Sequence, residues 1–148
     1  MREILFRGKR IDNGEWVEGC LLKVTLNGKT AHLIFGDNFS FDGHDVKALS
    51  HALVDPSTVG QFTGLTDKNG ERIFEGDRVV YPDGTSYSSY DDYNEGVVDY
   101  DEEAMRFYFT DRWSVEMEDF DVVDGVMVDV EIIGTIHDNP ELMEVHHE

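Results

Sequence analysis

Short runs of alternating apolar and polar residues, separated by turn residues, fill the first third of the chain. Asn13-Gly14 and Asn27-Gly28 divide the stretch EILFRGKRIDNGEWVEGCLLKVTLNGKTAHLIFG into three such runs. Asn-Gly is typical of tight β-hairpins, because both central residues of a type I′ turn need a positive φ. Alternation within the runs is that of strands whose successive side chains point to opposite faces. The pattern predicts an N-terminal antiparallel meander of three strands.

The next segments follow the same logic of turn residues between short runs. Residues 36–47, rich in Gly, Asp and Asn, predict a loop in which Phe39 and Phe41 fold back onto the core. The stretch 67–70, Asp-Lys-Asn-Gly, predicts a third hairpin turn between FTGLT and ERIF. A sharp bend at 75–77, Glu-Gly-Asp, is expected to begin the strand DRVVY.

The second half of the chain again favours strands. Residues 82–93 are polar, contain three tyrosines and predict a long mobile loop. EGVVDYD, MRFYFTD, VEM and GVMVDVEIIGTIHD are further β-like runs. Asn139 as N-cap and Pro140 at the first helical position indicate one closing helical turn. Short strands at this spacing favour a small barrel over a sandwich, because a closed sheet has no exposed edge. The predicted fold is mainly β, with little helix.

Length and composition are those of a folded chain of 148 residues, 40% of them apolar. We predict a β-meander region at 1–56 and a barrel region at 57–148, closely associated or forming one compact domain. Cys20 is the single cysteine, which rules out an internal disulfide or a Cys-rich zinc site, and we expect it to be a small buried apolar residue. No signal peptide or membrane span is visible in the sequence, so we predict a cytoplasmic protein.

The formal charge of −20 is unevenly distributed. Residues 1–80 hold 10 Lys and Arg against 12 Asp and Glu, a net of −2, whereas residues 81–148 hold 2 against 20, a net of −18. Nucleic-acid affinity comes largely from Lys and Arg that neutralise phosphates. Direct nucleic-acid binding is therefore not expected, unless the small cluster Arg2, Arg7, Lys9 and Arg10 supplies it.

The acidic concentration between Asp91 and Glu131 counts 15 Asp and Glu against Arg106 and Arg112. It can be a solvated face that maintains solubility, a surface that imitates a nucleic-acid backbone, or a surface for a basic partner protein. Aromatic residues in the same region support a protein interface, because Tyr and Trp are enriched there. The candidate interaction surface consists of Asp99, Asp101, Glu102, Glu103 and Trp113.

Signals for catalysis or cofactors are weak. Asp67, Asn69 and Glu71 alternate as calcium ligands do, but an EF-hand loop counted from Asp67 has arginine where the sixth-position glycine and twelfth-position glutamate belong. The sequence contains no phosphate-loop, nucleophile-elbow or zinc-protease motif. The six histidines show no metal-ligand spacing except the adjacent C-terminal pair, which we interpret as part of a solvated tail. We predict no enzymatic activity, no metal and no cofactor.

Two stretches, STVGQFTGLTDKNGERIFEGDRV at 57–79 and VEIIGTIHDNPELM at 130–143, resemble the YopX family of phage and prophage proteins. The opening REILFRGKR is similar to the family's N-terminus, so the resemblance spans nearly the whole chain. It implies a C-terminal part similar to an SH3-like barrel, and it carries no catalytic residues because the family has no assigned function. Its motif residues are read structurally, as turns, close packing and turn hydrogen bonds: Gly60, Gly64, Asp67, Asn69, Gly70, Glu75, Gly76, Asp77, Gly134, Asn139 and Pro140.

The sequence thus predicts a phage- or prophage-encoded accessory protein that acts through protein contacts. The alternative function is an acidic nucleic-acid mimic that inhibits a host DNA- or RNA-binding protein. Partner identity and oligomeric state, a homo-oligomer included, stay open at this point.

Overall fold

The computed structural model describes residues 3–36, 39–48, 51–82, 93–110, 115–117 and 120–138. The predicted mainly-β class is confirmed: in these ranges the regular elements are strands, apart from the short 3-10 helix η1 and Met117, which also has 3-10 conformation. The chain divides into two compact units, unit 1 (Met1–Phe62) and unit 2 (Thr63–Glu148), and β7 (Gly60–Thr66) carries it from one to the next. The division into domains at residues 56 and 57 stays a prediction.

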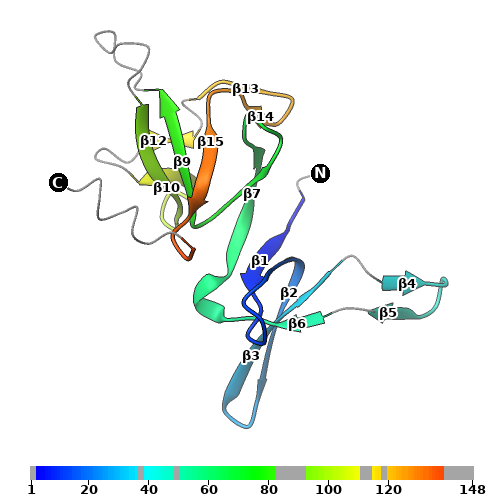
Figure 1. Cartoon of the computed structure of the whole chain (residues 1–148). Coiled ribbons are helices and arrows are strands. Elements are labelled where there is room, and N and C mark those ends of the chain that lie inside the picture. The colour runs from blue at the N-terminus through cyan, green and yellow to red at the C-terminus, as the bar shows by residue number, and fades with distance from the viewer. Residues whose placement is uncertain are drawn as a thin grey trace. The chain divides into compact units, whose positions relative to one another are not determined.

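Unit 1 is built on the predicted meander, in which consecutive strands pair antiparallel (Figure 1). Its strand order is β7-β1-β2-β3-β6. Asn27 and Gly28 have φ values of 53° and 77°, the pair of positive angles that a type I′ turn requires. The elements besides β7 are β1 (Phe6–Lys9), β2 (Trp16–Leu26), β3 (Lys29–Phe35), β4 (Phe39–Phe41), β5 (Val46–Ala48), β6 (His51–Leu53) and η1 (Pro56–Thr58).

One face of this sheet carries a small core. Ile34, Ala52 and Val54 are buried there, and partly buried residues pack against them: Phe6, Val17, Leu21 and Val59. Asp55 caps η1 by accepting a hydrogen bond from the Ser57 backbone N–H at 3.0 Å. On the opposite face of β2, Leu22, Val24 and Leu26 are exposed.

Two expectations for unit 1 were wrong. Residues 36–47 contain a hairpin of β4 and β5, in which the Asp42 carboxylate accepts backbone N–H groups of His44 and Asp45 and closes the turn. Phe41 is 65% exposed and does not return to the core, while the side chain of Phe39 lies outside the described part. Cys20 is exposed rather than buried, because its position in β2 points away from the Ile34 core.

Unit 2 centres on an antiparallel sheet of five strands in the order β12-β11-β10-β9-β15 (Figure 1). Its strands after β7 are β8 (Arg72–Phe74), β9 (Asp77–Pro82), β10 (Tyr93–Asp101), β11 (Arg106–Thr110), β12 (Val115–Glu116), β13 (Val122–Val123), β14 (Val126–Met127) and β15 (Glu131–Thr135). β8 pairs with β7, and Val126 of β14 pairs with Thr66 of β7 in parallel.

The sheet is open in the part of unit 2 that the structure describes, because no pairing joins its edge strands β12 and β15. Closure into an SH3-like barrel is therefore not confirmed. Of the predicted loop 82–93, residues 83–92 lie outside the described ranges, and Pro82 and Tyr93 are strand ends. The predicted closing turn at Asn139 and Pro140 also lies outside them.

Alternate residues of β9, β10 and β11 face a continuous core in unit 2. Tyr81 stacks on Phe109 with ring centroids 5.2 Å apart, and the edge of Phe120 meets Tyr81 at 5.0 Å. The buried members of this core are Ile73, Val79, Tyr81, Val98, Phe109, Met117, Met127 and Val130. The residues between them along the strands form the outer face of the sheet, which holds the acidic positions of β10.

Candidate interaction site

Asp67, the most conspicuous residue of the quoted motif, has a structural role. It is 1% exposed, and its Oδ1 accepts the backbone N–H groups of Asn69 at 2.9 Å and Glu71 at 3.0 Å. Its Oδ2 accepts the N–H of Ile132 at 3.0 Å, which ties the β7–β8 turn to β15. Both carboxylate oxygens are thus engaged by the backbone, as in a turn and not as in a calcium loop.

The Glu75-Gly76-Asp77 bend is organised in the same way. Asp77 is fully buried, and its Oδ2 accepts the Phe74 N–H at 2.8 Å. Gly76 has a φ of 88°, donates its N–H to the Val98 carbonyl and accepts one from Ile136. The backbone reversal needs glycine here, since a side chain at positive φ is strained.

The remaining motif residues serve backbone geometry. Gly60 is buried where β7 pairs with Arg7, Gly64 and Gly70 have φ values of 90° and 82°, and Gly134 lies at the register shift between β15 and β9. Asn139 and Pro140 lie outside the described residues. The motif is a set of turn and packing positions and does not assemble a reaction centre.

Four of the five candidate surface residues lie together at the end of β10 and in the following turn. Asp99 is exposed on the outer face of the sheet, where the Tyr108 hydroxyl donates to its Oδ2 at 3.3 Å. Asp101 accepts the N–H groups of Glu103 and Ala104, so it closes the turn in which Glu102 and Glu103 are exposed. The fifth candidate, Trp113, lies outside the described residues.

Charge in unit 2 is strongly negative. Its residues include 5 Lys and Arg against 24 Asp and Glu, a formal net of −19, while unit 1 holds 7 against 8. In the described part of unit 2, Glu95 pairs with the nearly buried Arg78 at 3.1 Å, and Glu131 pairs with Lys68 at 3.2 Å. The exposed acidic groups of the β10–β11 turn therefore add to a negative field that extends over the unit.

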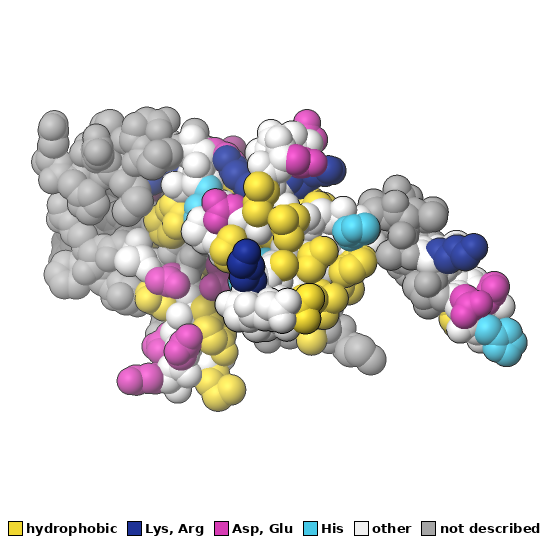
Figure 2. Space-filling view, turned by 90° about the horizontal axis from the view of Figure 1, so that it is seen from below, with side chains coloured by type: hydrophobic (Ala, Val, Ile, Leu, Met, Phe, Trp, Pro, Cys, Tyr) yellow, Lys and Arg dark blue, Asp and Glu magenta, His cyan; other side chains and the backbone are white. Residues whose placement is uncertain are grey.

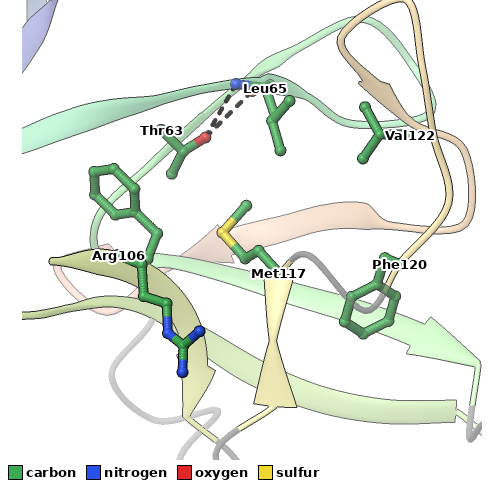
Figure 3. Close-up of a pocket in the computed structure, with 7 residues that line it drawn as sticks. Thr63, Leu65, Arg106, Met117, Phe120 and Val122 are labelled. Atoms are coloured by element: carbon green, nitrogen blue, oxygen red, sulfur yellow. Dashed lines mark hydrogen bonds between the residues drawn. The ribbon is translucent and has the colours of Figure 1, made fainter. Parts of the chain in front are cut away.

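A pocket of about 530 Å³ opens beside the core of unit 2 (Figure 3). Its lining is mostly apolar: Leu65, Phe107, Met117, Phe120 and Val122, with Thr63 and Arg106. The Thr63 hydroxyl donates to the Ile73 carbonyl at 2.9 Å and accepts the Leu65 N–H at 3.2 Å. In Figure 3 the Arg106 guanidinium points away from Thr63 and Leu65.

The lining of the pocket is suited to an apolar group. Its volume falls in the range of about 300–1,000 Å³ that is usual for ligand sites. The seven lining residues include no His, Cys, Asp or Glu, and the described residues contain no cluster of such side chains that could hold a metal ion. What the lining offers is hydrophobic contact, with a thioether and two aromatic rings that adapt to an inserted side chain.

Sequence reasoning did not find this pocket. Its lining residues come from β7, β11, β13 and the segment around Met117 and Phe120, so no local spacing connects them. Phe107 and Phe120 lie in the acidic region whose aromatic residues supported a protein interface, and this was the available signal. Leu65, Met117 and Val122 carried no sequence signal that indicates a pocket.

The arrangement is that of a small β protein with turn-rich strands, an acidic surface and an apolar pocket. A sequence profile described as YopX protein matches residues 5–144, and the chain belongs to this YopX family. A solved structure, the crystal structure of protein EF1440 from Enterococcus faecalis, is similar to it in fold. The TM-score is 0.59 at 24% identity, over 97% of this chain and 99% of that one. Comparison with curated proteins gave no match. None of the helices in the described ranges has the length and apolar character to cross a membrane.

Proposed function

We propose that this YopX-family chain is a phage- or prophage-encoded accessory protein whose unit 2 is a protein–protein interaction module in the bacterial cytoplasm. The observation that carries the proposal is the apolar pocket of about 530 Å³ in a unit of net charge −19. We infer a basic partner that inserts an apolar side chain into this pocket. The SH3-like arrangement also remains a proposal for unit 2, supported by its five-stranded antiparallel sheet.

The apolar pocket and the acidic groups contribute to different rate constants of binding. Burying a Leu, Met or Phe side chain is worth about 1.5–3 kcal/mol, and such an anchor mainly slows dissociation. The acidic groups around Asp99, Glu102 and Glu103 act at longer range, through attraction that raises the association rate and decays over about 8 Å at physiological salt. A partner with basic residues around one exposed apolar residue fits both.

The nucleic-acid mimic is the second candidate, favoured by the net charge of −19. A mimic needs free carboxylates in place of phosphates. Among the described acidic residues, however, Asp67, Asp77 and Asp101 accept backbone hydrogen bonds. Glu95 and Glu131 face Arg78 and Lys68. These carboxylates are engaged within the fold and are not free to take the place of phosphates. We therefore favour a protein partner that binds at the pocket over the nucleic-acid mimic.

The test compares two neighbouring valines of β13. Val122 lines the pocket and is 41% exposed, whereas Val123, 57% exposed, is absent from the lining. Val122→Asp places a charge in the pocket, and Val123→Asp places the same charge one residue away at a similar strand position. Tagged wild-type protein and both variants are used to capture partners from host cells that carry the prophage, with quantitative mass spectrometry.

We expect a protein that is captured by the wild type and by Val123→Asp and is lost by at least tenfold with Val122→Asp, while the melting temperatures of the two variants agree. Equal capture by both variants would contradict the pocket as the binding site. If the captured protein is a nucleic-acid-binding protein that nucleic acid displaces from both variants alike, the mimic is the better account.

A further inference from the structure

The β2–β3 hairpin of unit 1 carries apolar side chains on the face opposite the Ile34 core. Several of them are exposed: Leu22, Val24 and Leu26. Figure 2 looks at the molecule from the side of this hairpin and shows hydrophobic side chains gathered there. The register places in adjacent rows Leu22, Leu33 and Leu53, then Val24 and Ala31, then Cys20 and Phe35. With Leu26, which is 70% exposed, these residues are here called the outer face.

One backbone edge of β2 is open beside this face. Pairing between β1 and β2 ends at Phe6 and Gly19, and beyond Gly19 β2 pairs with β3 alone among the strands that the structure describes. The two-residue turn makes Leu26 and Lys29 a hydrogen-bonded pair, so every second residue of β2 from there bonds to β3. The residues between them direct their N–H and C=O groups away from β3: Leu21, Lys23 and Thr25. An exposed strand edge of this kind is a template for another strand.

We propose that this edge is a homodimer interface, in which β2 pairs antiparallel with β2 of a second copy of this chain. The outward-bonding residues must face each other, and the register that satisfies this sets Lys23 against the partner's Thr25. It also sets Val24 on the two-fold axis, opposite the partner's Val24, and Leu22 opposite the partner's Leu26. The outer face then continues as an apolar surface from one copy into the other.

Other registers fit less well. Moving the axis to Lys23 sets this residue opposite the partner's Lys23, and like charges directly opposite each other are destabilising. Moving it to Leu22 shifts the pairing toward Gly19, whose edge β1 already occupies. The register centred on Val24 keeps the apolar rows together and separates the lysines. A register centred on Thr25 would set Val24 opposite the partner's Leu26, and the trapping experiment below separates these two registers.

The expected affinity of the dimer follows from the net charge of unit 1 and from the area of the contact. Unit 1 has a net charge of −1, so contact through it avoids the repulsion that unit 2, at −19, would meet in contact with itself. Edge pairing buries a strip along β2 that is about 23 Å long and about 10 Å deep through the sheet, or about 200 Å², and leaves the outer face uncovered. This is well below the roughly 800 Å² that each partner contributes to a stable interface, even when edge hydrogen bonds are added. We therefore expect a dimer in the micromolar range that dissociates on dilution.

Disulfide trapping tests the register. Residues opposite each other in a non-hydrogen-bonded antiparallel pair have Cα atoms about 4.5 Å apart, within the range that disulfides span. In a Cys20→Ser background, Val24→Cys should give a covalent dimer under mild oxidation. The matched control is Thr25→Cys in the same background, an exposed neighbour that faces the partner's Lys23. We expect at least tenfold less covalent dimer from it. Equal trapping of both variants, or none at Val24, would overturn the proposal.

Sedimentation equilibrium tests the edge without a cross-link. Thr25→Pro removes an outward N–H that takes no part in β2–β3 pairing, and proline is tolerated on edge strands. We expect the wild type to show a concentration-dependent dimer and Thr25→Pro to weaken it by at least tenfold, with unchanged circular dichroism and melting. Wild-type protein that stays monomeric up to about 1 mM would refute the proposal, because even a weak interface associates at that concentration.

Discussion

Asp67 offers the sharpest test of how the motif holds unit 2 together. Its carboxylate is 1% exposed and accepts three backbone N–H groups, two within its own turn and one from Ile132, 65 residues further along the chain. Asp67→Ala removes all three acceptors. Asp67→Asn keeps an oxygen for the turn but presents an amide donor to the Ile132 N–H, so one bond is lost and two remain.

The expected cost follows from where these amides lie. A hydrogen bond to a charged group contributes about 1.5–3 kcal/mol, and a buried N–H left without an acceptor costs a similar amount. Ile132 is half-buried, so we assign its bond about 2 kcal/mol; Asn69 and Glu71 are exposed, so water replaces part of theirs, leaving about 1 kcal/mol each. Asp67→Asn should lower the free energy of unfolding by about 2 kcal/mol and Asp67→Ala by about 3–4 kcal/mol.

Urea denaturation gives these free energies, and hydrogen exchange of peptides that cover β8 and β15 shows whether unit 2 is the part affected. Equal stabilities of Asp67→Asn and Asp67→Ala would refute the assignment of separate bonds to the two oxygens. Saturable calcium binding by the wild type that Asp67→Ala abolishes would show that the turn is a ligand loop after all.

Three further predictions concern a strand position and two turns. Gly19→Ala should unfold unit 1, because the new Cβ would overlap the Phe35 carbonyl oxygen, and loss of the circular dichroism signal of the sheet would show it. Gly70→Val should cost only about 1–2 kcal/mol in urea denaturation, since φ is 82° but no atom lies within 4 Å of the new Cβ. The N–H groups of Asp45 and His44 lower the pKa of Asp42. The β4–β5 hairpin should therefore keep its full stability above the ordinary carboxyl pKa of about 4 and lose stability as the pH falls through the lowered pKa of Asp42. An NMR titration of the His44 and Asp45 amides measures this loss. Asp42→Asn should remove the pH dependence.

The turns of this fold could be predicted from sequence, because their chemistry is local. Asn27-Gly28 and the stretch around Gly70 adopt positive φ values that only a few residue types tolerate. The Asn-Gly dipeptides therefore predict the hairpin turns. The strand that begins at Asp77 followed from the bend before it. Such features depend on neighbours within a few residues and need no knowledge of the tertiary fold.

Features that depend on distant contacts were missed. Alternation alone does not tell which face of β2 is covered, so Cys20 was expected to be buried. Phe41 was expected in the core because it is aromatic, but its hairpin pairs only with itself among the described strands. The bond from Ile132 to Asp67 and the pocket lining join segments far apart in sequence, which no local pattern encodes.

The central claim, that unit 2 binds a basic partner through an apolar pocket, is tested most directly by the rate constants of the captured partner in a salt series. Val122→Asp should raise the dissociation rate by at least tenfold, because it removes the anchor site. Neutralising Asp99, Glu102 and Glu103 to Asn or Gln should lower the association rate and flatten its salt dependence, with dissociation unchanged and the turn-closing Asp101 intact. A dissociation rate that Val122→Asp leaves at the value of the Val123→Asp control would contradict the account.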